Sequence, residues 1–169
     1  MTSDINSIYV TALRNTRALE KQGLEQMERQ VSGLENYPEY AAVLRAHIPT
    51  TKSQLARLDA ALSAVGESAS SLKETVAGIV GTVGAAVHAV AGDETLKNLY
   101  AGYAYQYDQI AAYRSLIVIA EAAGQGAQAS GFRTSIEEEK KAAEAIDRLI
   151  EPVTKTYLSR ETSGQKADS

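Results

Sequence analysis

The chain has 169 residues, enough for one domain with a buried core, and it contains neither cysteine nor tryptophan. The missing cysteines exclude disulfide frameworks, thiolate zinc sites and cysteine nucleophiles. A net charge of −4, with lysine and arginine scattered along the chain, argues against a nucleic-acid partner. The amino terminus lacks the basic start and apolar core of a signal peptide, so we expect a cytoplasmic protein.

The first half of the chain is predicted to form two long helices. Apolar residues recur with a period near 3.6 over residues 4–35 and again over 38–65, while β-branched alternation is almost absent. Pro38 suits the first turn of the second helix. Pro49 lies inside that helix, where we expect a kink because proline removes a backbone hydrogen bond.

A connector of about 28 residues follows, and its uncharged run 75–92 needs interpretation. A membrane span needs ~20 predominantly apolar residues. This run is rich in glycine and alanine and contains His88, so we predict a buried connecting helix, begun by a capping box at Ser71. Membrane association through residues 75–92 is the weaker alternative.

The second half is predicted to form two more long helices, over residues 94–123 and 127–159, with a turn at 124–126. Pro152 should kink or interrupt the last of them. The remaining residues, 160–169, are polar, and we expect a disordered tail.

Two helical pairs joined by a long connector indicate an all-α fold. The connector can cross the length of a bundle, which is the ferritin-like arrangement of four helices with one long crossover. We therefore expect one ferritin-like domain over residues 1–159, with an extra short helix in the crossover.

The third helix carries glutamines where a bundle metalloprotein would carry carboxylates. Gln106 and Gln109 are three residues apart and share one helix face. Diiron bundles use this spacing for inward-facing ligand pairs, but a carboxamide lacks the charge that a hard cation needs. Asp108 is turned well off that face, which favours a solvated carboxylate.

Tyrosine is frequent on the same helix. Five tyrosines cannot all face inward from one helix, so some must lie on the surface, where an aromatic face suits a homodimer contact. They are Tyr100, Tyr103, Tyr105, Tyr107 and Tyr113.

Several strings in the chain resemble the YciE/YciF family of bacterial ferritin-like stress proteins. The resemblance covers roughly residues 7–158. It implies a ferritin-like bundle, usually dimeric, often with a two-metal carboxylate site, and expression under stress with a poorly defined molecular activity. The matching strings are residues 18–22, 35–40, 47–59, 91–98, 109–116 and 136–140.

The resemblance carries over the metal ligands of two helices. Glu20 matches the carboxylate of the first helix in the family. Glu138 and Glu139 match the acidic run of the fourth helix.

The ligands of the other two helices are absent. The second helix of the family normally offers a glutamate-bearing stretch where this chain has Pro49, Thr50 and Lys52. The third helix normally has two carboxylates where this chain has Gln106 and Gln109. Lys52 would add a positive charge near the former site.

We therefore predict a hydrogen-bonded polar layer without a metal, no catalytic residue and no cofactor. Gln106, Gln109 and Thr51 would satisfy Glu20 and Glu139, whose pKa values burial would raise. The protein would then be a structural or interaction protein, a homodimer in a bacterial stress context.

The enzyme alternative is an oxidase that binds two iron or manganese ions at an atypical site containing Glu20, Glu138 and Glu139. A single adventitious metal on Glu20, Glu139 and His47 is also open. A lone histidine beside a core stripe is more often a structural hydrogen-bond partner.

Overall fold

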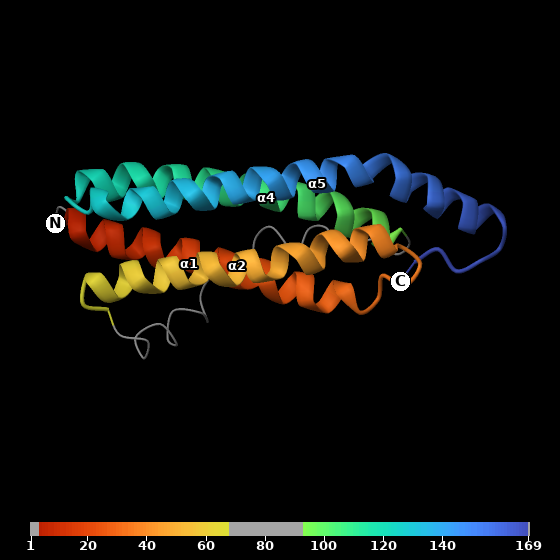
Figure 1. Cartoon of the computed structure of the whole chain (residues 1–169), viewed down its shortest axis with the longest axis horizontal. Coiled ribbons are helices and arrows are strands. Elements are labelled where there is room, and N and C mark those ends of the chain that lie inside the picture. Colours follow the sequence, from red (N-terminus) through yellow and green to blue (C-terminus); the bar gives the residue numbers. More distant parts are fainter. Residues whose placement is uncertain (1–3, 68–92, 169) are drawn as a thin grey trace.

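The computed structural model describes residues 4–67 and 93–168, which form four long helices and no strand. Figure 1 shows the helices packed side by side into one elongated bundle. The elements are α1 (Ile5–Val31), α2 (Pro38–Ala64), α4 (Glu94–Ala122), the short 3₁₀ helix η2 (Gly126–Gln128) and α5 (Ala129–Thr162). The all-α bundle predicted from the periodicity is confirmed. The predicted connecting helix, its capping box and His88 lie outside the described residues.

The helix pairs are closed by short turns whose residues suit the geometry. Pro38 occupies the first turn of α2, where its missing N–H would have no helical partner. After α4, Gly124 has φ +72°, a left-handed conformation that glycine adopts without steric cost. The Gln125 N–H then donates to the Ala120 carbonyl at 2.8 Å, which completes a glycine-terminated helix end.

Both internal prolines lie within unbroken helices. We expected Pro49 to kink α2 and Pro152 to kink or interrupt α5. Both helices run through their prolines without interruption, so the expected interruption of α5 is wrong. The two kinks stay predictions. Buried residues flank each proline on both sides: His47 and Thr51 in α2, and Leu149 and Val153 in α5. Packing on both sides of each proline therefore offsets the ~3 kcal/mol penalty of proline in a helix.

The four helices form a square in which α1 contacts α2 and α4, while α5 contacts α2 and α4. Two apolar clusters lie at opposite ends of the bundle, and each contains residues of both hairpins, α1–α2 and α4–α5. We call the first the Phe132 cluster: Tyr9, Leu13, Leu58, Ala61, Leu62, Ile110, Tyr113, Leu116, Ala120, Phe132 and Ile136. The second is the Tyr40 cluster: Met27, Leu34, Tyr37, Tyr40, Ala41, Leu44, Leu96, Leu99, Ile146, Leu149 and Val153.

The carboxy-terminal residues differ from the expected disordered tail over 160–169. Helix α5 continues to Thr162, and the residues after it return to the bundle. The Tyr37 hydroxyl donates to the buried Ala167 carbonyl at 2.7 Å, and the Thr95 N–H donates to Asp168 Oδ1 at 2.9 Å. Polar composition alone indicated a solvated tail, whereas its contacts depend on the tertiary placement of Tyr37, just before α2, and Thr95, in the first turn of α4.

No described helix is both long enough and apolar enough to cross a membrane. The run 75–92, on which the membrane alternative depends, lies outside the described residues.

Candidate functional site: a buried polar layer

A layer of polar side chains separates the two apolar clusters. Every long helix contributes to it, because each carries polar residues on its inward stripe at helical spacing. We call this set the polar layer: Glu20, His47, Thr51, Gln54, Gln106, Gln109, Ser135 and Glu139, all buried.

Two acids and two amides form the centre of the polar layer. Gln109 Nε2 donates to Glu20 Oε2 at 2.6 Å, and Gln54 Nε2 donates to Glu139 Oε1 at 2.6 Å. Glu20 and Gln109 come from α1 and α4, and Glu139 and Gln54 from α5 and α2. Both bonds therefore join one hairpin to the other, rather than the two helices of one hairpin.

His47 belongs to the same layer. Its Nε2 lies 3.4 Å from Glu139 Oε1, and the side chain is buried. Glu139 thus faces both Gln54 and His47 from α2. His47 Nε2 makes no hydrogen bond to a described residue, so its expected role as a structural hydrogen-bond partner stays a prediction.

Glu20 and Glu139 are close enough to influence each other electrostatically. Burial raises the pKa of Glu20 to about 8, and the charge of Glu139 acts in the same direction. The nearby Tyr113 hydroxyl and the Gln109 amide oppose this rise only partly. Glu20 is therefore mostly protonated at neutral pH, and the rise agrees with the prediction that burial raises the pKa of this acid.

Glu138 does not join this acid pair. It is half-buried and bound by the Arg57 guanidinium through two hydrogen bonds, of 2.6 and 2.8 Å. Arg57 also donates to Ser135 Oγ at 3.1 Å. Glu138 and Glu139 are adjacent in the sequence, so they point to different sides of α5. Only Glu139 thus lies in the polar layer.

The second helix differs from the sequence prediction. Pro49 is exposed, Thr50 is only partly buried, and Lys52 is exposed with its Nζ 3.0 Å from Glu28 Oε1. The expectation that Lys52 adds charge near the site is therefore wrong, because its helical position points it outward toward α1. The residue of α2 that donates to Glu139 is Gln54, which we did not predict.

A signal for Gln54 was present in the sequence. It lies seven residues after His47 and four before Leu58, so it shares their inward stripe through Thr51. The family resemblance points to residues 49–52 instead. The periodicity of the helix was the better guide.

The donor set does not fit a two-metal centre. Within residues 4–67 and 93–168, no group of three or more histidine, aspartate and glutamate side chains is arranged to hold a metal ion. Among the described residues only Glu20 and Glu139 are buried acids, and one oxygen of each accepts an amide hydrogen bond. Two dications among amides and hydroxyls would be poorly neutralised.

Several oxygens of the polar layer have no hydrogen-bond partner among the described residues. A protonated Glu20 supplies one additional donor to this group, which favours the neutral acid. The unpaired atoms are Glu20 Oε1, Thr51 Oγ1, Gln54 Oε1, Gln106 Oε1, Gln109 Oε1 and Glu139 Oε2.

The tyrosines of α4 divide between core and surface, as predicted. Tyr113 is fully buried, and the Tyr105 hydroxyl donates to the Leu19 carbonyl. Tyr100 and Tyr107 are exposed. Asp108 is exposed as well, which agrees with the prediction of a solvated carboxylate.

Comparison with known proteins identifies the family of this chain. The profile of a family described as a domain of unknown function, DUF892, matches residues 4–159. The chain belongs to the DUF892 family.

Solved structures resemble this DUF892 protein over nearly their whole length. A protein from Xanthomonas campestris pv. campestris is 25% identical, with 95% of this chain and 99% of that chain covered and a TM-score of 0.78. The Escherichia coli stress protein YciF is 19% identical, with 88% and 96% covered and a TM-score of 0.66. YcfI from Rhodopseudomonas palustris, provisionally described as a structural protein, is also 19% identical, with 86% and 94% covered and a TM-score of 0.66. The resemblance to the YciE/YciF family and the ferritin-like fold are confirmed.

Proposed function

We propose that this DUF892 protein is a non-catalytic, metal-free member of the YciE/YciF type that acts as a structural or interaction protein. The observation that carries the proposal is the pairing of each buried acid with a glutamine amide from the opposite hairpin. Each amide satisfies a carboxylate oxygen that would otherwise be available to bind a metal ion.

The chemistry of the layer supports this role. A hydrogen bond between neutral groups contributes ~0.5–1.5 kcal/mol and one to a charged group ~1.5–3 kcal/mol, and a buried acid without a partner is strongly unfavourable. Gln54 and Gln109 therefore stabilise a bundle that would otherwise bury two unsatisfied acids. Glu20, mostly protonated at neutral pH, lowers the buried charge further.

The biological setting is part of the same proposal. One structural relative is described as a stress protein and another provisionally as a structural protein. We place this chain in the same setting, as a cytoplasmic homodimer that contributes to a bacterial stress response through contacts rather than through a reaction.

Metal analysis tests the proposal directly. Protein purified without chelators should contain far less than one iron or manganese per chain by plasma mass spectrometry, and titration with Fe²⁺ or Mn²⁺ should release no binding heat. The double variant Gln54→Glu/Gln109→Glu is the matched control, because it returns two carboxylates to the layer and should bind metal more tightly.

The opposite result is equally clear. Stoichiometric iron or manganese in the native chain, lost on Glu20→Ala, would overturn the metal-free proposal. It would return the protein to the oxidase class, with Glu20 and Glu139 as ligands and Glu138 released from Arg57.

A further inference from the structure

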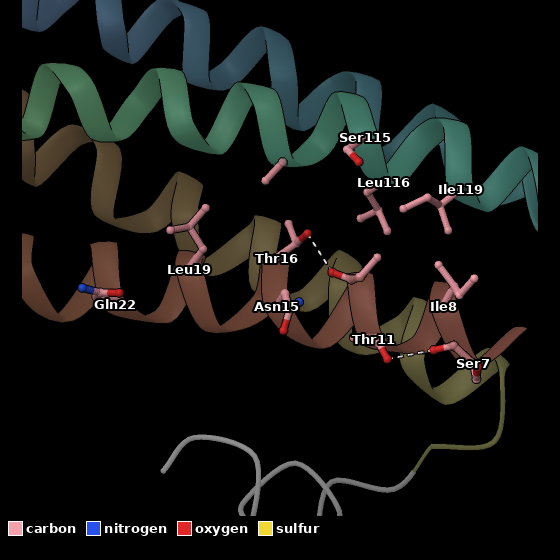
Figure 2. Close-up of a pocket in the computed structure, with 12 residues that line it drawn as sticks. Ser7, Ile8, Thr11, Asn15, Thr16, Leu19, Gln22, Ser115, Leu116 and Ile119 are labelled. Carbon is pink, nitrogen blue, oxygen red and sulfur yellow. Dashed lines mark hydrogen bonds between the residues drawn. The ribbon is translucent and has the colours of Figure 1, made fainter. Parts of the chain in front are cut away.

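Two hollows lie between α1 and α4. Figure 2 shows the larger, a groove of about 610 Å³ that runs from Ser7 to Gln22 of α1 and is lined by uncharged residues. The second hollow, of about 460 Å³, also includes Gln22 and continues toward the end of α1. We call it the polar pocket, because most side chains that line it are polar, among them Gln22, Gln26, Arg29, Gln30, Glu94 and Asn98.

A small cavity of about 20 Å³ adjoins the polar pocket and reaches the polar layer. Gln26, Gln30 and Tyr40 line both the cavity and the polar pocket. Gln106 and Gln109, which belong to the polar layer, line the cavity as well. The cavity therefore lies between a surface pocket and the buried amides of α4.

The size and chemistry of the cavity suit one water molecule. A buried water needs roughly 10–15 Å³ of space and typically makes ~3 hydrogen bonds to buried polar groups that lack other partners. Gln106 and Gln109 are 5% and 2% exposed, and Oε1 of each has no hydrogen-bond partner among the described residues. The two O–H groups of one water match these two acceptors, and an amide N–H of Gln26 or Gln30 can donate to its oxygen.

Gly102 keeps part of this space open. It lies inside α4, where alanine would stabilise the helix relative to glycine. A Cβ at this position would meet Ile146 Cδ1 at 3.7 Å, an ordinary van der Waals contact. Steric packing thus does not require glycine here. Because Gly102 and Ile146 both line the cavity, the space left by the missing methyl group belongs to it.

Gly23, which lines the cavity from α1, has a different role. A Cβ at this position would lie only 2.7 Å from Tyr105 Cε1, so glycine allows the Tyr105 ring to approach α1 closely. The Tyr105 hydroxyl donates to the Leu19 carbonyl, which fixes the ring beside α1. Tyr105 also lines the cavity. One glycine therefore positions a wall of the cavity, and the other leaves room within it.

We propose that this cavity is a hydration site of the polar layer. One water molecule enters from the polar pocket past Gln26 and Gln30, and it donates hydrogen bonds to the Oε1 atoms of Gln106 and Gln109. Gln109 Nε2 in turn donates to Glu20 Oε2 at 2.6 Å. The site thus brings solvent to within one side chain of a buried acid while the four helices stay packed.

Gly102→Ala tests the site, because its methyl group would occupy the cavity beside Ile146. Gly131→Ala is the matched control: Gly131 lies inside α5, its Cβ would meet Arg57 Cδ at the same 3.7 Å, and it does not line the cavity. NMR cross-peaks between water and the side-chain amide protons of Gln106 and Gln109 should appear in the native chain and in Gly131→Ala. They should be at least tenfold weaker in Gly102→Ala. Equal cross-peaks in all three proteins would overturn the hydration site.

Crystallography gives an independent readout of the same site. A crystal structure of the native chain should show one ordered water within ~2.5–3.0 Å of both Gln106 Oε1 and Gln109 Oε1. The water should be absent from Gly102→Ala and present in Gly131→Ala. A native structure with no water at these atoms would contradict the proposal.

The entry route has its own test in the residence time of the water, measured by oxygen-17 relaxation dispersion. Gln26→Leu places an apolar side chain between the polar pocket and the cavity, and it should lengthen the residence time at least tenfold. Gln22→Leu is the control, since Gln22 is exposed and lines the polar pocket but not the cavity. A circular-dichroism melt verifies the fold of both variants. An unchanged residence time in Gln26→Leu would show that water does not enter past this residue.

The outcomes also separate the water site from the proposed function. Failure of the water site would leave the metal-free layer untouched, because metal analysis decides that layer. Stoichiometric iron or manganese would overturn the metal-free proposal, whereas water cross-peaks lost only in Gly102→Ala would still identify the hydration site.

Discussion

The polar layer and the apolar clusters on either side of it stabilise the bundle in different ways. The Phe132 and Tyr40 clusters bury large side chains whose contribution depends on apolar area and packing density. The polar layer buries acids and amides that gain little unless each donor meets one particular acceptor. Apolar packing therefore supplies most of the stability, while the layer favours one alignment of the two hairpins.

The two acids of the layer also differ from each other. Glu139 faces two groups of α2, the Gln54 amide and His47 Nε2. Glu20 faces the Gln109 amide and the Tyr113 hydroxyl, in a setting that raises its pKa to about 8. The Glu20 side of the layer is thus the side on which stability should depend on pH.

The largest effect is expected in the apolar clusters. Phe132 is 1% exposed, and Phe132→Ala should lower the free energy of unfolding by ~3–5 kcal/mol through lost burial and a cavity. Urea unfolding measures the change. Leu158→Ala is the control, since Leu158 is 56% exposed and its truncation should change stability by less than ~0.5 kcal/mol. Similar losses in both variants would contradict the assigned core.

The pH dependence of stability tests the Glu20 side. The pKa of Glu20 is about 8 in the folded chain, whereas a free glutamate side chain has a pKa of 4.5, so the folded chain holds a proton that the unfolded chain releases. This contribution is complete below about pH 4.5 and is lost as pH rises toward 8. The free energy of unfolding should therefore fall by a few kcal/mol more across this range in the native chain than in Glu20→Gln.

Thermal melts of the two proteins at matched pH measure this difference. The other titrating groups contribute equally to both proteins, so their effect on stability cancels in the comparison. Parallel pH profiles for the native chain and Glu20→Gln would show that Glu20 is ionised in the fold.

The hydrogen bond to Glu139 should have an intermediate effect. Gln54→Ala leaves Glu139 Oε1 without its amide donor, so we expect a loss of ~2–3 kcal/mol in the free energy of unfolding. Ser53→Ala, at an exposed neighbouring position, should cost less than ~0.5 kcal/mol. Chemical unfolding of both variants measures these changes. If Gln54→Ala left the free energy of unfolding nearly unchanged, Glu139 would have another hydrogen-bond partner in the variant.

The smallest effect sharpens the contrast within the layer. Gln106 is buried and makes no hydrogen bond to a described residue, with its Oε1 unpaired. Gln106→Leu should be neutral or stabilising by up to ~1 kcal/mol, because it removes an unsatisfied polar group. Gln109→Leu should destabilise by ~2 kcal/mol, because Glu20 loses its donor. Equal melting temperatures for the two variants would show that the hydrogen bond of Gln109 adds no more to stability than the unpaired Gln106.

Much of this architecture was accessible from residue patterns. The 3.6-residue periodicity located all four long helices, and helix ends such as Pro38 and Gly124 followed from local chemistry. The inward positions of Glu20, Gln106 and Gln109 followed from the same stripes. Local preference and amphipathic period act within one helix, so one helix's sequence is sufficient to predict them.

The partnerships among these residues depended on the packing of different helices. A helical period tells which side of a helix faces inward, but not how far one helix slides or rotates against its neighbour. That alignment pairs Gln54 with Glu139, gives Glu138 to Arg57 and turns Lys52 toward Glu28. It also docks the terminal residues on Tyr37 and forms the groove between α1 and α4. Residue types and spacing thus determined the helices and the acids and amides that face inward, and tertiary packing decided which of them meet, because hydrogen bonds and grooves require atoms from separate helices at one place.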